Sequence, residues 1–310
     1  MKHLFIINPA AGKTDQTKSY TERIHAACRG LDYEIAVSAH PGNCRELARA
    51  AAEAGQEIRI YACGGDGTLN EIVNGVVGFP NAAITHFAGG SGNDFIKLFT
   101  DAAPFRDLGR LLDSREEEID LIRCNGHYAI NVCSVGLDAR IGTDVAKYKH
   151  LPLVSGFGAY ALSALVNTVK GVAEHYVVEI NGERLDGKKT LVLASNGRYY
   201  GGGFHPVPDA DPRDGMLDVL LVTKVSRLKV LSVIGKYKDG KYAQFPELIR
   251  HVRARELTIR CDRETPVNLD GELLLSDTVH ISVAPEKIRF FYPRGVELCA
   301  GESLPPQNPA

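Results

Sequence analysis

Short apolar runs alternate with segments of helical periodicity over the first third of the chain. Each run has the length of a buried strand, and the segments between them carry apolar residues at helical spacing. This alternation predicts β-α-β units and an α/β domain with a mainly parallel sheet covered by helices on both faces. The predicted strands are Leu4–Ile7, Tyr33–Val37, Ile58–Cys63 and Ala83–Ala88. The predicted helices are Ser19–Cys28, Cys44–Ala54, Leu69–Val77 and a last one through Phe95 and Phe99.

From Ile119 onwards, strand-like runs follow one another with hairpin turns between them. Asn-Gly pairs at 125–126 and 181–182 separate successive runs, and this pair is a strong hairpin signal. We therefore predict a β-rich, mostly antiparallel second domain. Its predicted strands are Ile119–Cys124, Tyr128–Cys133, Val177–Ile180, Leu191–Ala194, Leu217–Val222, Leu257–Cys261, Val279–Val283 and Ile288–Tyr292. Two helices, Gly158–Val172 and Leu228–Tyr237, are predicted among them.

The composition indicates a globular protein that does not bind nucleic acid. A length of 310 residues exceeds the usual size of one hydrophobic core, which favours two domains. A net charge of −2 leaves no basic footprint for DNA or RNA. Seven scattered cysteines without a C-x-x-C pair and the lack of a signal peptide indicate a cytoplasmic protein. The uncharged segment Leu151–Val169 approaches membrane-spanning length, but its polar residues favour a buried or interfacial helix.

Three glycine-bearing loops each leave a predicted strand and enter a predicted helix. They are N-P-A-A-G at 8–12, G-G-D-G-T at 64–68 and G-G-S-G-N-D at 89–94. Because the carboxyl ends of parallel strands share one edge of a sheet, we expect the loops to lie together. Glycines let the backbone approach a ligand closely, and free N–H groups at helix N-termini suit phosphate. With Thr68, Ser91 and Asn93 as further donors, the loops predict a phosphate or nucleotide site.

Two acidic features do not fit simple phosphate binding. Asp66 would repel phosphate oxygens, so it requires a bridging cation, a proton to accept or a ribose hydroxyl. The alternative is an N-cap aspartate for the following helix, which its glycine neighbours disfavour. The segment Asp209–Asp218 holds four carboxylates in ten residues and is a candidate site for a hard cation. The alternative for that segment is a solvated turn.

The order of these motifs resembles the catalytic domain of the diacylglycerol kinase family, which includes bacterial lipid kinases and sphingosine and ceramide kinases. The resemblance rests on N-P-A-A-G, G-G-D-G-T-L-N-E and G-G-S-G-N-D-F, and continues at 201–219 and in N-L-D-G-E at 268–272. It implies ATP-dependent phosphorylation of a lipid hydroxyl, such as that of diacylglycerol. The implied fold is an α/β domain like those of NAD kinase and phosphofructokinase, followed by the β-rich domain.

The resemblance also implies how the chain divides its tasks. Residues 1–120 would form the nucleotide-binding domain, with 287–310 returning to it, and residues 121–286 would bind lipid. The implied partners are ATP, Mg²⁺ and a membrane lipid, reached by peripheral contact at the inner membrane surface. Ser91 and Ser38 stand where the family often has threonine, so the hydroxyl is kept. The oligomeric state stays open, with a dimer as one option.

Site residues follow from the positions that match the family motifs. Asp270 and Glu272 are the candidates for the base that accepts the proton of the hydroxyl; the family pattern marks Glu272, while Asp270 is chemically as able. A hairpin turn with solvated acids is the alternative for this pair. A structural Mg²⁺ is implied at Asp214 with the carbonyls of Asp211 and Met216. The implied nucleotide site comprises Asn8, Pro9, Gly12, Ser38, Gly64, Gly65, Asp66, Gly67, Thr68, Asn70, Glu71, Ser91, Asn93 and Asp94, with Asp66 also expected to be catalytic.

Two other functions fit parts of the same pattern. An NAD kinase-like phosphotransferase would use the G-G-D-G loop on a different hydroxyl, but the N-P-A-A-G, D-G-x-L-D and L-D-G-E motifs favour the lipid kinase. A non-catalytic regulator that binds nucleotide or lipid would carry a degenerate site. The intact Asp66, Asp270 and Glu272 argue against such a regulator.

Overall fold

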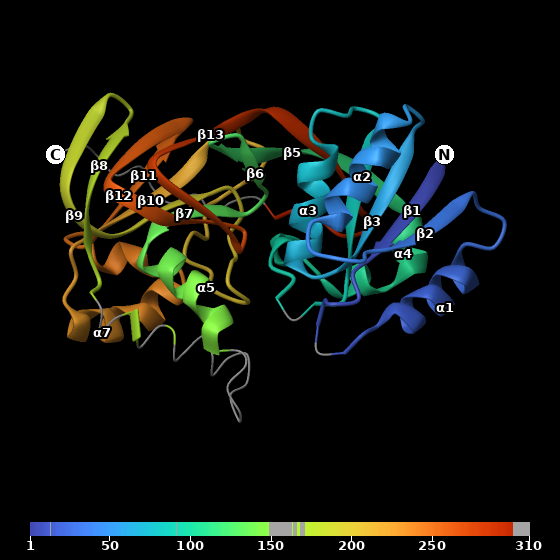
Figure 1. Ribbon diagram of the computed structural model, residues 1–310, viewed down its shortest axis with the longest axis horizontal. Coiled ribbons are helices and arrows are strands. Elements are labelled where there is room, and N and C mark those ends of the chain that lie inside the picture. The colour runs from blue at the N-terminus through green and yellow to red at the C-terminus, as the bar shows by residue number, and fades with distance from the viewer. Residues whose placement is uncertain (13, 91, 149–162, 164–165, 168–170, 300–310) are drawn as a thin grey trace.

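The computed structural model describes residues 1–12, 14–90, 92–148, 163, 166–167 and 171–299. Its strands form one continuous sheet through both halves of the molecule (Figure 1). The strands are β1 (Lys2–Ile7), β2 (Tyr33–Val37), β3 (Ile58–Gly64), β4 (Ala82–Ala88), β5 (Ser114–Cys124), β6 (His127–Ala129), β7 (Val132–Gly136), β8 (Glu174–Ile180), β9 (Glu183–Ser195), β10 (Leu217–Thr223), β11 (Ile249–Ala254), β12 (Glu256–Leu269) and β13 (Glu272–Pro293). The main path runs β11-β10-β9-β7-β12-β13-β4-β3-β1-β2.

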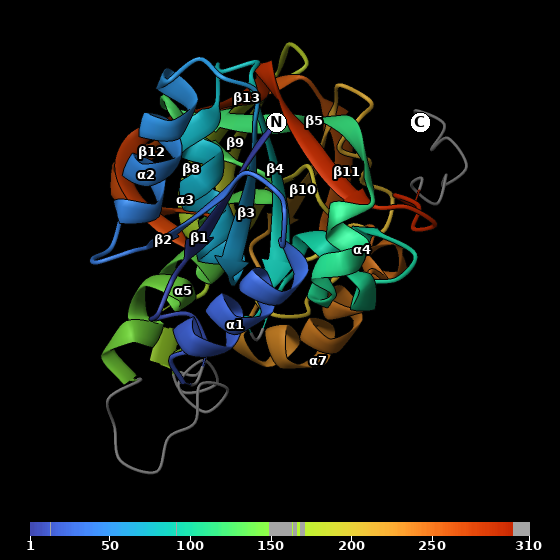
Figure 2. The ribbon, with the colours of Figure 1, turned by 90° about the vertical axis from the view of Figure 1, so that its right-hand side faces the viewer.

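The N-terminal lobe, defined here as β1–β4 with the helices that pack on them, has its strands in the order β2-β1-β3-β4, and neighbouring strands are parallel. Figure 2 shows α2 and α3 on one face of these strands and α1 and α4 on the other. β1, β3 and β4 are almost entirely buried because both faces are covered, whereas the edge strand β2 is partly exposed. The helices are α1 (Thr17–Ala27), α2 (Asn43–Glu53), α3 (Asp66–Val76) and α4 (Leu108–Leu112).

The C-terminal lobe, β5–β12 with α5 (Leu137–Tyr148) and α7 (Arg227–Lys238), is antiparallel, as expected. The hairpin signals are confirmed: Asn125 and Asn181 have φ of 46° and 49°, and the glycine after each is also at positive φ. Both helices lie along the lower edge of the lobe in Figure 1.

β13 joins the two lobes. It pairs antiparallel with β12 and β5 and, through Arg289 and Phe290, parallel with β4. Phe290, Phe291 and Tyr292 are buried in the core of the N-terminal lobe. The expectation of a separate, mainly parallel sheet is therefore corrected: the parallel strands end one continuous sheet that is mostly antiparallel, because a single strand serves both lobes. The domain limits 1–120, 121–286 and 287–310 remain a prediction.

The predicted strand Tyr128–Cys133 is interrupted in the structure. β6 ends at Ala129 and β7 begins at Val132. Between them, the backbone N–H groups of Ile130 and Asn131 donate to the Asp270 carboxylate. A side chain from a distant turn thus replaces the partner strand at this point, which the local sequence does not reveal.

Other differences concern helices. The helix predicted through Phe95 and Phe99 is the 3₁₀ turn η1 (Phe95–Leu98), and α5 had no counterpart among the predictions. The predicted helix Gly158–Val172 and the segment Leu151–Val169 fall largely outside the described residues. In the part of the chain that the structure describes, no helix is long and apolar enough to cross a bilayer. All seven cysteines are free thiols, as expected.

Candidate active site

The glycine-bearing loops meet at the C-terminal ends of β1, β3 and β4. The carbonyl of Gly64 accepts the N–H groups of Gly89 at 2.9 Å and Gly90 at 3.0 Å. A Cβ on Gly90 would lie 2.5 Å from the Cα of Gly65, so this backbone contact requires glycine. The second and third loops therefore lie together, as the sheet edge predicts.

The first loop is tied to the other two by side chains. Asn8 donates from Nδ2 to Oγ1 of Thr68 at 3.0 Å. Gln16, just beyond this loop, donates from Nε2 to the carbonyl of Gly89 at 3.4 Å. All three loops thus form one polar surface, with backbone N–H groups at the start of α3 directed toward any ligand that enters.

Two carboxylates, Asp66 and Asp94, lie where the loops meet. Asp66 is the first residue of α3, whose N-cap is Gly65 and makes no side-chain cap, so the N-cap alternative for Asp66 is wrong. One Asp66 oxygen instead accepts the backbone N–H of Asp94. The Asp94 carboxylate accepts Nζ of Lys97 at 2.5 Å and the N–H of Gly202 at 2.7 Å. Burial and the negative charge of Asp66 raise the pKa of Asp94.

Lys97 is a site residue that the sequence analysis missed. Its side chain is 30% exposed, and its ammonium lies 5.8 Å from the ring centroid of Tyr199. Because η1 is a 3₁₀ turn, residues three apart share a face, which brings Lys97 back onto Asp94. Tyr199 and Gly202 come from the C-terminal lobe, so both lobes meet around this lysine. A lysine soon after G-G-S-G-N-D was the available signal.

The side chains of Asn70 and Glu71, one turn into α3, form hydrogen bonds with other elements. The two carboxylate oxygens of Glu71 accept the N–H groups of Gly42 and Cys44, each at 3.0 Å, at the N-terminus of α2. Asn70 donates from Nδ2 to Asp270 at 3.3 Å. Both side chains hold α3 against its neighbours, and their nucleotide roles stay predictions.

The other predicted nucleotide residues lie around the same loops. Ser38 follows β2, and its N–H donates to the carbonyl of Ile7 at 2.9 Å. Asn93 has a φ of 51° and donates from Nδ2 to the carbonyl of Gly90 at 2.7 Å. Ser91 lies outside the described residues. Pro9 and Gly12 lie in the first loop, and Gly67 lies in the first turn of α3.

The Asp270 carboxylate is enclosed by hydrogen-bond donors. It accepts the backbone N–H groups of Ile130 at 2.6 Å, Asn131 at 3.1 Å and Val132 at 2.8 Å, in addition to Asn70. Asp270 has a φ of 50°, so its backbone adopts a turn conformation, as the hairpin-turn alternative predicts. Its carboxylate, however, is not solvated, because it accepts these hydrogen bonds from the protein. Burial raises its pKa to about 6, although the backbone donors oppose this shift. Because these donors occupy its oxygens, the carboxylate is poorly accessible to a substrate hydroxyl in spite of its raised pKa.

Glu272 differs from its neighbour in every one of these respects. It is the first residue of β13 and is exposed. Among the described residues, no group donates a hydrogen bond to its carboxylate. Of the two candidates for the base, Glu272 therefore has the available carboxylate.

The predicted metal residues are engaged by arginines. Both oxygens of Asp211 accept from Arg213 at 2.7 Å. Asp214 pairs with Arg253 and also accepts the N–H of Met216 at 2.9 Å. Of the predicted ligands, the Asp214 carboxylate is thus engaged by protein donors, whereas Asp211 and Met216 were predicted to contribute their carbonyls. Among the described residues, no cluster of three or more acidic, histidine or cysteine side chains could hold a metal. The structural Mg²⁺ stays a prediction.

Asp120 in β5 is a second residue that the sequence analysis missed. Its side chain is 2% exposed, and it pairs with Nζ of Lys287 at 2.9 Å. It also accepts the N–H of Gly215 at 2.8 Å, which holds the acidic segment 209–218 against β5. The signal was a single acid within the apolar run I-D-L-I.

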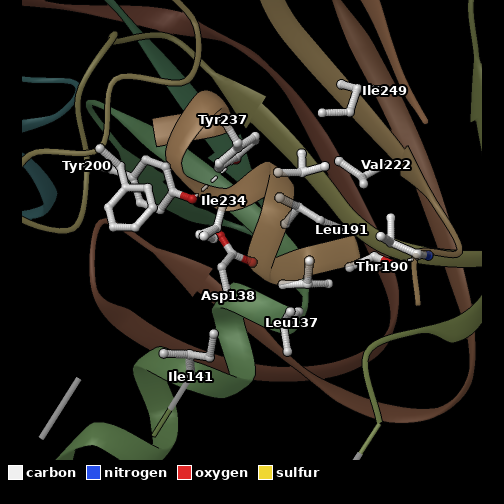
Figure 3. Close-up of a pocket in the computed structure, with 14 residues that line it drawn as sticks. Leu137, Asp138, Ile141, Thr190, Leu191, Tyr200, Val222, Ile234, Tyr237 and Ile249 are labelled. Carbon is white, nitrogen blue, oxygen red and sulfur yellow. Dashed lines mark hydrogen bonds between the residues drawn. The ribbon is translucent and has the colours of Figure 1, made fainter. Parts of the chain in front are cut away.

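An apolar pocket lies between α5, α7 and the sheet of the C-terminal lobe (Figure 3). Its empty space, counted together with the open solvent at its mouth, is about 590 Å³. Asp138, in the first turn of α5, is the one charged residue among its lining residues. The hydroxyls of Tyr200 and Tyr237 lie 3.2 Å apart at one end. The apolar lining includes Leu137, Ile141, Leu191, Val222, Ile234 and Ile249.

We expect Asp138→Asn to make stability less dependent on pH. Burial raises the pKa of Asp138 from 3.8 to about 6, against hydrogen bonds from Ser134 and Ala139. The native state therefore holds this proton more tightly than the unfolded state. The stability that protonated Asp138 adds to the native state is fully present below pH 3.8 and is lost as the pH rises to about 6.

The measurement is the free energy of unfolding of both proteins in denaturant at about pH 4 and pH 7. Between these values the variant should gain up to roughly 3 kcal/mol relative to the parent protein, since each pKa unit corresponds to about 1.4 kcal/mol. An equal difference at both pH values would mean that Asp138 titrates alike in the folded and unfolded chains.

Comparison with known proteins agrees with this geometry. The family model of the diacylglycerol kinase catalytic domain matches residues 2–124, and that of the YegS C-terminal NAD kinase beta sandwich-like domain matches residues 131–292. A "Putative lipid kinase" of Staphylococcus carnosus (strain TM300) is 26% identical over 299 residues, 93% of this chain and 96% of that protein. One of Staphylococcus epidermidis (strain ATCC 12228) is 29% identical over 233 residues, 74% of this chain and 75% of that protein.

A solved structure has the same fold. The crystal structure of "a putative diacylglycerol kinase from Bacillus anthracis str. Sterne" superposes with a TM-score of 0.74 at 23% identity, over 96% of this chain and 98% of that chain. The two family models together cover most of the chain, and the model of the C-terminal domain alone covers more than half of it. This chain therefore belongs to the family that combines a diacylglycerol kinase catalytic domain with a YegS-type C-terminal domain.

Proposed function

We propose that this protein is a lipid kinase that transfers the γ-phosphate of ATP, with Mg²⁺, to a lipid hydroxyl such as that of diacylglycerol. One observation carries the proposal: three glycine-bearing loops with two adjacent carboxylates lie on the same side of the molecule as an apolar pocket with a single acid. In Figures 1 and 2, the C-terminal ends of β3 and β4 and the helices α5 and α7 lie toward this common side.

The N-terminal lobe supplies the nucleotide site in this proposal. Backbone N–H groups of the loops and the hydroxyl of Thr68 would bind phosphate oxygens, and the N-terminus of α3 favours their negative charge. Lys97 adds a cation that can move from Asp94 to a phosphate. Asp66 and Asp94 fit a Mg²⁺ that arrives with the nucleotide, because such an ion needs one or two carboxylates besides phosphates and water. When bound, the ion would neutralise charge on the transferred phosphoryl group.

The C-terminal lobe supplies the acceptor site in this proposal. An acyl chain would fill the apolar pocket, and Asp138 would orient a hydroxyl or ester near its wall. Glu272, with its unengaged carboxylate, would take the proton of the attacking hydroxyl. Asp270 would act only through position, by holding the Ile130–Val132 backbone and α3 together. The protein would work in the cytoplasm, at the inner surface of the membrane that contains its substrate.

Incubation of the pure protein with γ-labelled ATP, Mg²⁺, a panel of lipids and NAD tests the proposal. We expect label in one or more lipids and none in NAD. Label in NAD alone would show an NAD kinase-like phosphotransferase. ATP binding without transfer to any acceptor would show a non-catalytic regulator.

A further inference from the structure

The segment 224–241, which contains α7, has a net positive charge, whereas the chain as a whole has a net negative charge. It carries six basic residues and one acidic residue, whereas the whole chain has a net charge of −2. Of the basic residues, Lys241 lies 3.8 Å from the single acid, Asp239. Within the described part of the chain, Lys224, Lys236 and Lys238 form no ion pair with a carboxylate. The positive charge of this segment is therefore largely unneutralised.

Apolar side chains stand among these cations on the solvent side of α7. Leu228 is 82% exposed, the highest value among the large hydrophobic residues that the structure describes, and Ile234 is 42% exposed. On the inner side, Val233 and Tyr237 are buried against the pocket. Ile234 both lines the pocket and reaches solvent, so the pocket and the exposed side of α7 meet at this residue (Figure 3).

We infer that the exposed side of α7, defined by Leu228, Ile234, Lys236 and Lys238 together with Lys224 just before the helix, docks the protein on an anionic phospholipid bilayer. The inference rests on the proposed function, because it supplies the surface through which a membrane-embedded lipid reaches the pocket. Exposed apolar side chains among lysines are typical of helices that lie in the membrane interface. A nucleic acid or an acidic protein would account for the charge but not for the exposed Leu228 on the helix whose Ile234 lines the pocket.

Docking is measured by co-sedimentation of the intact protein with phosphatidylcholine vesicles, with and without phosphatidylglycerol, at low and high salt. We expect binding that requires phosphatidylglycerol and weakens at high salt. Lys236→Gln and Lys238→Gln should each lower the partition coefficient roughly fivefold. Leu228→Ser should lower it roughly tenfold. All three side chains are exposed, so the melting temperature should not change.

Matched controls remove the same chemistry elsewhere on the surface. Leu275, 55% exposed on β13, serves as the control leucine in Leu275→Ser. Arg123 of β5 and Arg184 of β9, both exposed and outside α7, serve as control cations. Equal losses in control and α7 variants, or binding that does not depend on phosphatidylglycerol, would overturn the inference. So would binding of RNA and not of vesicles.

Assays of phosphoryl transfer separate this inference from the proposed function. Leu228→Ser should raise the apparent KM for lipid in vesicles and leave kcat for a short-chain, water-soluble diacylglycerol unchanged. If the protein phosphorylates no lipid yet docks through α7, the proposed function fails and the surface stands. If it phosphorylates lipid while the α7 variants dock normally, the function stands and the surface is overturned.

Discussion

Asp66→Asn is expected to lower kcat for phosphoryl transfer by roughly 10²-fold or more and to leave the melting temperature nearly unchanged. The amide keeps an oxygen for the backbone N–H of Asp94, so the loop contact survives. What is lost is a negative charge at the meeting point of the three loops, beside Asp94 and its partner Lys97. The substitution therefore separates the charge of Asp66 from its hydrogen bond.

Initial rates of label transfer from ATP, with thermal unfolding of the same samples, give the two quantities. Glu22→Gln is the matched control, because it makes the same chemical change on α1 at a side chain that is 67% exposed. We expect the control to keep full activity. A variant at Asp66 that retained more than about a tenth of the parental kcat would show that this carboxylate has no direct part in the chemistry.

Asp270→Ala is expected to destabilise the fold by about 3–6 kcal/mol. The carboxylate is the acceptor for three successive backbone N–H groups between β6 and β7 and for Asn70 of α3. Each buried donor left without an acceptor costs about 1–3 kcal/mol. The loss is a large fraction of the total stability of a typical protein. For a chain of this size, the melting temperature should fall by roughly 10 °C or more.

Glu272→Ala provides the opposite result only two residues away. Its side chain is exposed and accepts no hydrogen bond from the described residues, so stability should change by less than about 0.5 kcal/mol. Its turnover should fall by roughly 10²–10⁴-fold if it accepts the proton. Thermal unfolding and initial rates of phosphoryl transfer, measured for both variants, test these two expectations. An Asp270→Ala protein that melts normally and is inactive would reverse the two roles.

Sequence patterns predicted the parts of the site that depend on short-range rules. The alternation of apolar runs correctly located β1 to β4. The rule that parallel strands end at one edge of the sheet correctly predicted that the glycine loops lie together. Asn-Gly pairs located two hairpins, because the backbone twist of this turn matches that of the strands. These predictions succeed where the local sequence alone determines the backbone.

The contacts that organise the site join residues far apart along the chain. Asn70 meets Asp270 across 200 positions, and Gly202 donates to Asp94 across 108. No periodicity in one sequence encodes such pairs, since each depends on how the two lobes are packed. The 3₁₀ geometry that turns Lys97 onto Asp94 is likewise decided by packing after G-G-S-G-N-D. The partners of Glu71 at the N-terminus of α2 could not be read from the sequence for the same reason.

The strand β13 also has a consequence for synthesis of the chain on the ribosome. The N-terminal lobe emerges before the C-terminal lobe, but Arg289 and Phe290, which complete the pairing of β4, emerge only after all strands of the C-terminal lobe. Until then, β4 carries unpaired N–H and C=O groups, and the core lacks three aromatic side chains of β13. We expect the lobe to reach its native state only after translation of β13, when both lobes become stable together. During translation, the growing chain would expose an edge that chaperones can recognise.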